Sequence, residues 1–345
     1  MDTAPPPMNN EFPAFAVEIE NLTKIYTRRT GPTIKALDNI ELKVRRGSVF
    51  GLLGPNGAGK STLINILAGL AIKTSGTARI WGFDIKTQMR RARSAIGVVP
   101  QEVNLDAFFC PREVLELQAG LYGVPKKERR TMEILEAVGL ADKADAYARS
   151  LSGGMKRRLL IAKALVHTPP VVVLDEPTAG VDVELRRQLW AYMRELNKGG
   201  TTILVTTHYL EEAEEMCDTI AIIDHGKLIA CDATPALINR LDQRTLTITT
   251  NEHLKKVPDV LIPLSAILTA PNKLIFRYSP SIIQVGEILA RIQTANLTVA
   301  DLTTMDADLE DVFLRLTGID EKENHKTAVD PPTGAISIAR GTPQL

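Results

Sequence analysis

Short apolar runs alternate with segments of helical periodicity along the first 241 residues of the chain. Three runs, 49–53, 171–174 and 201–206, predict buried strands; the first two are almost wholly apolar, and the third has an apolar centre between threonines, as is typical of strands covered on both faces. Apolar residues recur at helical spacing in the segments between them. These helical segments are 63–70, 159–166, 183–196 and 210–217. Alternation of strands and helices predicts an α/β fold with a mostly parallel sheet.

Two other parts of this region have a different pattern. Residues 14–22 and 34–44 alternate as strands do, and both precede the first buried run. Residues 112–121 and 126–138 have helical spacing without strong strand signals. The pattern therefore predicts a helical insert at about 102–167 in an α/β core that spans 14–241.

The character of the chain changes after about residue 241. Residues 245–250 and 273–278 predict strands with one solvated face, followed by a helix at 281–294, a strand at 297–303 and a last helix at 309–317. We therefore expect a small C-terminal α+β domain over 242–318. The two ends, 1–13 with three consecutive prolines and 319–345 with its polar composition, predict a flexible leader and a disordered tail.

Composition excludes several classes of protein. Lys and Arg together number 41, as do Asp and Glu, so no net field favours nucleic acid. The three cysteines are scattered without a C-x-x-C pair, which excludes a disulfide framework or zinc site of the usual spacing. The start of the chain lacks the features of a signal peptide. No stretch approaches the about 18 apolar residues of a membrane span, so a partner would have to supply one.

Residues 54–62 read GPNGAGKST and fit the phosphate-binding pattern G-x-x-x-x-G-K-[ST]. The motif lies between an expected strand and an expected helix, where glycines let successive N–H groups face one anion. Lys60 would neutralise the β- and γ-phosphates, and the Ser61 hydroxyl would hold Mg²⁺. The predicted phosphate loop comprises Gly54, Pro55, Asn56, Gly57, Ala58, Gly59, Lys60, Ser61 and Thr62.

The apolar run at 171–174 is followed by Asp175 and Glu176. A carboxylate at the tip of a strand can hold Mg²⁺ opposite Ser61, and the next one can polarise an attacking water. An Asp-Glu pair is often surface charge, but its place after a buried strand downstream of a phosphate loop favours the catalytic interpretation.

Residues 151–155 read LSGGM and are followed by three basic residues, Lys156, Arg157 and Arg158. Ser152 can cap a helix, and Gly153 and Gly154 permit close approach of another group to the backbone. Composition leaves two interpretations open here, a second anion site at a helix N-terminus or a capped helix and nothing more.

The order of these motifs resembles the ATP-binding subunit of ABC transporters. A phosphate loop, Gln101 after a short strand, LSGG, a strand ending in Asp-Glu and His208 after another strand follow one another as they do in that family. The stretches TAGVDVELRRQLW, TTHYLEEAEEMCD and LEDVFLRLTG are similar to its type-2 exporter branch. The resemblance covers about 14–241 and implies a P-loop NTPase core with an antiparallel β subdomain and a helical insert.

The resemblance also implies roles for single residues. Tyr26 would stack on adenine, and Gln101 would contact Mg²⁺ and the attacking water. Asp175 would be the metal-site carboxylate, Glu176 the general base and His208 the contact to the γ-phosphate. Asp182 would cross a dimer interface, at which Ser152, Gly153 and Gly154 bind the nucleotide of the other subunit. Met155 and Val183 depart from the residues that many members have at these positions, Gln and Pro.

The function implied is ATP hydrolysis with Mg²⁺ by a homodimer bound to an integral membrane permease at the cytoplasmic face of the inner membrane. Export is implied by the branch. Two alternatives stand beside it: an ABC ATPase that acts on ribosomes or DNA, and a regulatory nucleotide-binding module without turnover. One set of motifs in the chain and the neutral net charge argue against the first, and Glu176 and His208 argue against the second.

Overall fold

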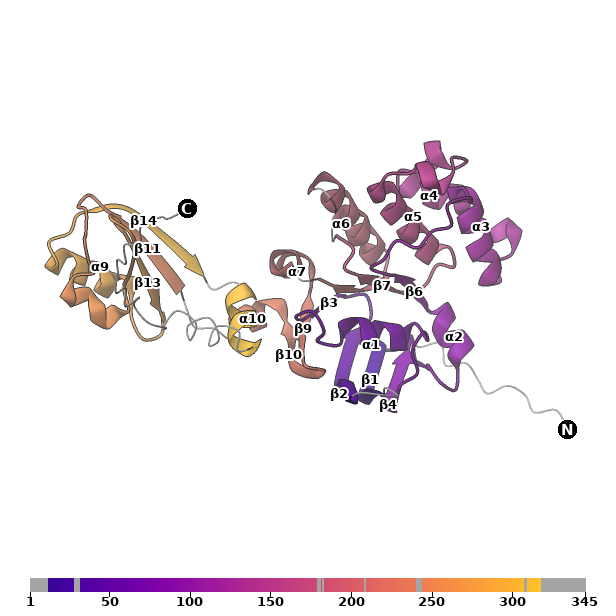
Figure 1. The fold of residues 1–345 in the computed structure, drawn as a ribbon, viewed down its shortest axis with the longest axis horizontal. Helices are drawn as coiled ribbons and strands as arrows, with labels where there is room; N and C mark the ends of the chain where they lie inside the picture. The colour runs from indigo at the N-terminus through magenta and orange to yellow at the C-terminus, as the bar shows by residue number, and fades with distance from the viewer. Residues whose placement is uncertain are drawn as a thin grey trace, which may run out of the picture.

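The computed structural model describes residues 12–27, 32–178, 181, 183–207, 209–239, 244–306 and 309–317, and these ranges form three sheets (Figure 1). Asp182 and His208 lie outside the described residues, as do 1–11 of the expected leader and the whole of the expected tail. None of the helices in the described ranges has the length and the apolar character needed to span a bilayer.

A six-stranded sheet forms the centre of the first domain, with the strand order β10-β9-β3-β8-β7-β6. The strands are β3 (Val49–Leu53), β6 (Ile96–Val99), β7 (Val171–Asp175), β8 (Thr202–Thr206), β9 (Thr219–Asp224) and β10 (Lys227–Ala233). All neighbours pair in parallel except β9 and β10, which form a hairpin. The predicted, mostly parallel sheet is thus confirmed, and the carboxyl ends of β3, β6, β7 and β8 meet at one edge.

A four-stranded antiparallel sheet packs against the central sheet. Its order is β2-β1-β4-β5, formed by β1 (Phe15–Tyr26), β2 (Ile34–Arg45), β4 (Ser75–Ile80) and β5 (Phe83–Asp84), with α2 (Met89–Ser94) following. Helix α1 (Lys60–Leu67) lies between the two sheets, where Leu63 and Ile66 are buried in a core shared by both (Figure 1). This sheet is the antiparallel β subdomain that the family resemblance implies.

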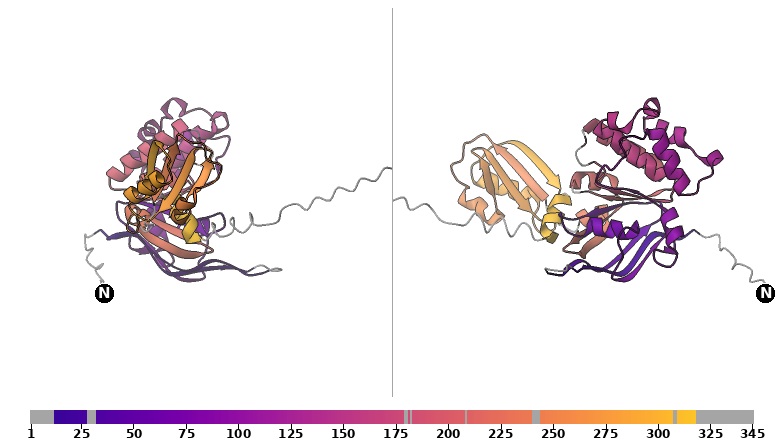
Figure 2. Two further views of the ribbon diagram at one scale, coloured as in Figure 1. Left: turned by 90° about the vertical axis from the view of Figure 1, so that its left-hand side faces the viewer. Right: turned by 45° about the vertical axis from the view of Figure 1, so that its right-hand side comes forward.

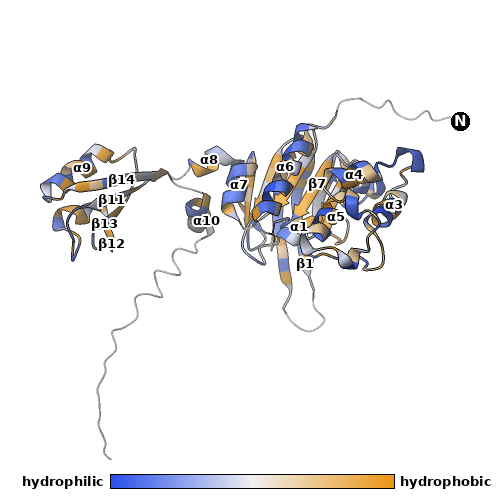
Figure 3. Cartoon of the chain, turned by 90° about the horizontal axis from the view of Figure 1, so that it is seen from above, coloured by the Kyte–Doolittle hydropathy of each residue, from blue (hydrophilic) through white to orange (hydrophobic). Residues whose placement is uncertain are grey.

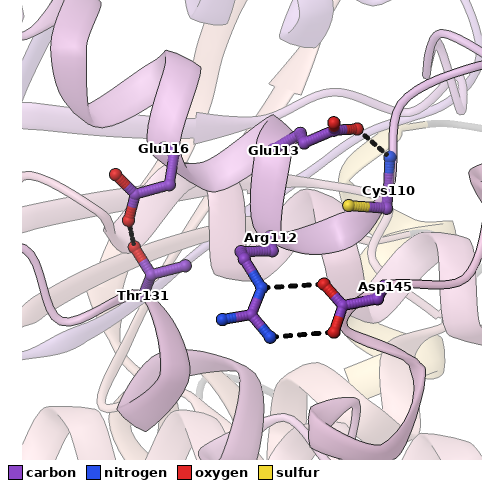
Figure 4. A network of polar contacts seen from close by, with 6 residues as sticks. All are labelled: Cys110, Arg112, Glu113, Glu116, Thr131 and Asp145. Atoms are coloured by element: carbon purple, nitrogen blue, oxygen red, sulfur yellow. Dashed lines mark hydrogen bonds and ion pairs between the residues drawn. The ribbon is translucent and has the colours of Figure 1, made fainter.

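The helical insert has a core of its own, built by α3 (Pro111–Leu121), α4 (Thr131–Ala137) and α5 (Gly153–Leu165). Polar contacts fix the start of α3: Arg112 makes two hydrogen bonds of 2.8 and 2.9 Å to Asp145, and the Cys110 N–H donates to Glu113 (Figure 4). Together these contacts tie α3 to the turn that precedes α5.

The helix expected over 126–138 is interrupted in the structure. A short 3₁₀ turn (Lys126–Glu128) ends at Arg129, which has extended backbone, and α4 begins only at Thr131. The Arg129 guanidinium donates to Glu116 on α3 at 2.6 Å, and the Thr131 hydroxyl also donates to Glu116 (Figure 4). These tertiary contacts draw the segment onto α3 and outweigh its helical periodicity.

The other face of the central sheet is covered by α5, α6 (Val183–Lys198), α7 (Leu210–Met216) and α8 (Thr234–Ile238). Figure 3 shows both apolar and hydrophilic residues on these helices, and the buried apolar ones lie in one cluster with residues of the strands. The central sheet is therefore covered on both sides, which explains why β3 and the first four residues of β7 are almost wholly apolar.

The C-terminal part forms a third, antiparallel sheet of order β12-β13-β11-β14. Its elements are β11 (Arg244–Thr250), a 3₁₀ turn (Asp259–Leu264), β12 (Ile267–Ala270), β13 (Lys273–Tyr278), α9 (Val285–Thr294) and β14 (Val299–Asp306). Leu246, Phe276 and Ile288 lie in a separate core between sheet and helix. Helix α9 starts four residues later than expected because Gln284 has extended backbone as its N-cap.

Helix α10 (Leu309–Thr317) does not join that third core. Leu309 and Val312 are buried in the same cluster as Ala213 of α7 and Leu237 of α8. Figures 1 and 2 show α10 between the third sheet and the first domain. The chain thus leaves the first domain after α8, forms the third sheet and returns to the first domain with a helix that we expected in the C-terminal domain.

Candidate functional site

Loop 54–59 joins β3 to α1, and two of its glycines are required by the close approach of other backbone. A Cβ on Gly54 would lie 2.1 Å from the carbonyl oxygen of Ile223. Gly59 has φ +111°, and a Cβ there would lie 2.5 Å from the carbonyl oxygen of Ala36. No side chain caps the N-terminus of α1, so its first N–H groups are available to an anion.

Lys60 lies inside the curve of this loop. Its Nζ donates to the carbonyl oxygens of Gly54 at 2.6 Å and Pro55 at 3.1 Å, and the residue is 6% exposed. Burial lowers the pKa of Lys60, and the nearby carboxylates of Glu176 and Asp175 oppose that shift. The cation is thus held at the end of the loop that faces the two carboxylates.

A cleft of about 470 Å³ opens over the loop. It brings together the predicted residues 56–62, Gln101 and Glu176, whereas Gly54 and Pro55 are not among its lining residues. Five lining residues were not predicted: Ile34, Lys35, Ala36, His225 and Gly226.

The hairpin residue Gly226 binds the loop directly. Its N–H donates to the Ala58 carbonyl at 2.9 Å, and its own carbonyl accepts from the Asp38 N–H at 2.8 Å. A Cβ on Gly226 would lie 2.8 Å from the Ala36 carbonyl oxygen. The sequence signals only a turn at His225-Gly226, and the contact to a loop far away in the sequence has no local signal.

Tyr26, expected to contact adenine, lies at the end of β1 beside the cleft. Its partner across the antiparallel pair is Ile34, which lines the cleft, but Tyr26 itself is not a lining residue. The ring is 39% exposed, and the Lys24 ammonium lies 4.5 Å from its centroid. Tyr26 therefore lies next to the cleft over the phosphate loop.

The two carboxylates at the end of β7 are both buried and have different partners. The Thr206 hydroxyl donates to Asp175 Oδ1 at 2.6 Å. Glu176 has φ +47°, and its N–H donates to the Thr206 hydroxyl at 2.9 Å. The Glu176 carboxylate accepts a hydrogen bond of 2.8 Å from Gln101 Nε2. Gln101 and Glu176 thus meet at the edge of the cleft.

Three predicted residues offer oxygen atoms that could hold a hard cation such as Mg²⁺: Ser61, Gln101 and Asp175. Within the described ranges no group of three or more His, Cys, Asp and Glu could hold a metal ion. A hydroxyl, an amide and a carboxylate beside a phosphate loop fit an ion that shares its coordination with phosphate oxygens and water, rather than an ion in an all-protein cage.

Ser152, Gly153 and Gly154 begin α5 away from this cleft. The Ser152 hydroxyl accepts from the Met155 N–H at 3.2 Å, so the expected cap is confirmed. Ser152 and Gly153 are exposed, and a Cβ on Gly153 would meet no atom within 4 Å. Packing within this chain therefore does not explain the glycine at 153, and none of the three residues lines the cleft.

Comparison with known proteins finds a matching sequence family and similar proteins of known type. The sequence family described as ABC transporter matches residues 37–179. The chain is 38% identical to the Nod factor export ATP-binding protein I of Ralstonia nicotianae. The alignment spans 306 residues, which are 88% of this chain and 94% of the relative. It is 36% identical to the daunorubicin/doxorubicin resistance ATP-binding protein DrrA of Streptomyces peucetius, over 90% of this chain and 94% of the relative.

Solved structures agree with these relatives. An ATP-binding subunit of an ABC transporter superposes with a TM-score of 0.59 at 28% identity, over 65% of this chain and 92% of that structure. A dimeric ATP-binding cassette in a post-hydrolysis state with ADP and Pi superposes with a TM-score of 0.58 at 27% identity, over 63% and 98%.

Proposed function

The chain belongs to the ATP-binding subunits of ABC transporters, and on that premise we propose which of its residues bind ATP, hydrolyse it and pass the result to a membrane partner. The family assignment carries the activity: the protein binds and hydrolyses ATP and serves an export system through a membrane component. The predicted class of the protein and its fold are thereby confirmed.

We propose that Glu176 is the general base for attack of water on the γ-phosphate. The hydrogen bond between Gln101 Nε2 and Glu176 is the observation that carries this assignment, because it joins the two predicted water-contacting side chains at the cleft. Lys60 and the N–H groups of the loop face the same space and would stabilise the charge that develops on the transferred phosphoryl group. His208 would contact the γ-phosphate, and Tyr26 would contact the adenine ring from the neighbouring strand.

Ser61, Asp175 and Gln101 would hold Mg²⁺ beside the phosphates. When bound, the ion neutralises phosphate charge and orients the phosphate chain. The Thr206 hydroxyl binds one oxygen of Asp175 and fixes the orientation of that carboxylate.

We propose that two copies of the chain bind two ATP molecules between them. Ser152, Gly153 and Gly154 would contact the nucleotide in the loop of the other copy, and Asp182 would lie at the interface. Three observations support this arrangement: the start of α5 is exposed, the space around Gly153 is open, and none of these residues lines the cleft of its own chain. Such an interface is isologous, since each copy gives and receives the same surfaces.

The helical insert is the proposed attachment site for an integral membrane permease at the cytoplasmic face of the inner membrane. Phe108 is 72% exposed and follows Gln101 closely in the chain. The Ala148 N–H donates to the Phe109 carbonyl at 2.9 Å, which brings exposed Tyr147 close to this segment. These exposed aromatic residues, close to the segment that follows Gln101 in the chain, form a surface through which a membrane partner could sense ATP turnover.

A pull-down from detergent-solubilised native membranes tests this proposal. Tagged wild-type protein is expected to recover a multi-span membrane chain, and Phe108→Ser is expected to lose it. Ile262→Ser, which changes an apolar residue of the C-terminal part that is 59% exposed, is the control and should retain the partner. Recovery of ribosomes or only soluble chains by the wild type would overturn the transport assignment and leave ATP hydrolysis intact.

A further inference from the structure

Arg157 is a buried arginine in the helix that starts with the LSGG motif. It is 4% exposed and lies on α5, five positions after the capping Ser152. The basic residues in this stretch suggested an anion site from the sequence, but the Arg157 side chain points into the protein. Its role is therefore not explained by nucleotide binding at the start of α5.

All five N–H donors of Arg157 bind backbone carbonyl oxygens. Nη1 donates to Pro100 at 2.7 Å and to Gln101 at 2.8 Å. Nη2 donates to Asp175 at 3.0 Å and to Glu176 at 2.5 Å, and Nε donates to Pro177 at 3.1 Å. Burial lowers the pKa of Arg157, and the charges of Asp175 and Glu176 oppose that shift, so the buried cation is compensated.

These carbonyls belong to the two segments that carry Gln101 and Glu176. One segment follows β6 and the other ends β7, so the single side chain of Arg157 joins the two backbones. Glu176 is held in the left-handed region at φ +47°, which a non-glycine residue adopts only when its surroundings impose it. Two hydrogen bonds hold Glu176 in this conformation. Arg157 donates to the Glu176 carbonyl, and the Glu176 N–H donates to the Thr206 hydroxyl.

We propose that Arg157 is a positioning residue that sets the Gln101–Glu176 pair for hydrolysis and links that pair to the start of α5. The inference rests on the proposed function. Because the start of α5 would contact the nucleotide of the other copy, Arg157 provides a rigid path from one ATP site to the water-activating pair of the second. A planar guanidinium is needed for this, since lysine offers three donors from a single atom and cannot span both segments.

Arg158 provides the matched control. It is the next residue on α5 and also donates to backbone, at 2.9 Å to Val138 and 3.1 Å to Gly139, but both acceptors lie in the helical insert. Arg157→Lys and Arg158→Lys therefore make the same chemical change one residue apart. Only the first change touches the segments of Gln101 and Glu176.

The test compares kcat for ATP hydrolysis with the Kd for ATP in both variants and in Gln101→Ala. We expect Arg157→Lys to lower kcat at least tenfold while Kd changes less than threefold, and Arg158→Lys to change both less than threefold. If Arg157 acts through Gln101, the double variant Arg157→Lys/Gln101→Ala should lie within about twofold of the slower single variant. Equal effects of the two lysine variants, a parallel loss of ATP affinity, or multiplicative effects in the double variant would overturn the inference.

Two further outcomes are separable. If the wild type hydrolyses no ATP, the proposed function fails, whereas a wild-type rate in Arg157→Lys sinks only the role of Arg157. If Arg157→Lys does not fold, hydrogen exchange of the amides at 101 and 176 is measured in the wild type and in Ser152→Arg with a non-hydrolysable ATP analogue. The inference expects protection in the wild type that is lost in Ser152→Arg, and equal protection in both would overturn it.

Discussion

Leu309→Ala tests whether α10 is part of the first domain. The Leu309 side chain is 0% exposed and packs with Ala213 and Leu237, and its N–H donates to Glu214 of α7 at 3.3 Å. Truncation of a leucine buried in this way costs about 2–5 kcal/mol when the site does not collapse. A helix of nine residues is too short to be stable alone, so we expect the cost to appear as local release of α10.

Hydrogen exchange gives the measurement, because it separates local release from global unfolding. The lower part of that range, about 2–3 kcal/mol, raises the released population roughly 30- to 160-fold. The amides of α10, and those of α7 that it covers, should exchange faster by that factor while the strands of the central sheet remain unchanged. Glu310→Ala, at an exposed position of the same helix, is the control and should change exchange less than fivefold. Unchanged exchange in Leu309→Ala would show that α10 does not contribute to the stability of the first domain.

Four further predictions concern the site and the pH dependence of stability. Glu176→Gln should keep ATP affinity within threefold but lower kcat by about 10²–10⁴-fold, the usual range for a lost general base; near wild-type turnover would remove that assignment. Lys60→Ala should raise the Kd for ATP at least tenfold in calorimetry, and an unchanged Kd would count against the loop assignment. Ser152→Arg should abolish ATP-dependent dimerisation while a single copy still binds ATP; surviving hydrolysis contradicts action across an interface. Burial raises the pKa of Cys217 and of Tyr192 to about 12, from 9 and 10 in the unfolded chain, so both stay protonated in the folded protein when the unfolded chain ionises. The urea midpoint should therefore be flat from pH 7 to 9 and fall between about pH 9 and 12, and a constant midpoint up to pH 11 would contradict the burial of these groups.

The parts of the site that could be predicted are encoded locally. The loop at 54–62 and the carboxylates after β7 have fixed spacings next to buried strands, and the cap by Ser152 is formed within four residues. Gly226 is different, because its contact with Ala58 depends on the hairpin reaching the loop from 168 positions away in the sequence. The sequence alone predicts a turn at Gly226, but it does not show that the phosphate loop packs against this turn.

The same reason accounts for the other differences in the fold. The helical periodicity of 126–138 is real, but the charge of Glu116 draws Arg129 onto α3 and interrupts the helix. The periodicity of α10 predicts one apolar face and does not say which core receives it. Likewise the basic residues after LSGG suggest an anion site, whereas the Arg157 side chain binds five carbonyl oxygens inside the protein, and only the tertiary structure shows these partners.

The pairing of β3 determines when the ATP site can form during synthesis. Gly47, just before this strand, donates its N–H to Thr202 across 155 positions of sequence, and Val49 donates to Asp218 across 169. Both neighbours of β3 in the sheet, β8 and β9, thus leave the ribosome long after the loop itself. At about 5–20 residues per second, the strand waits roughly 8–34 s for the partner at 218. Through that interval the apolar strand has open edges on both sides, so we expect nascent chains shorter than 218 residues to bind chaperones and not nucleotide.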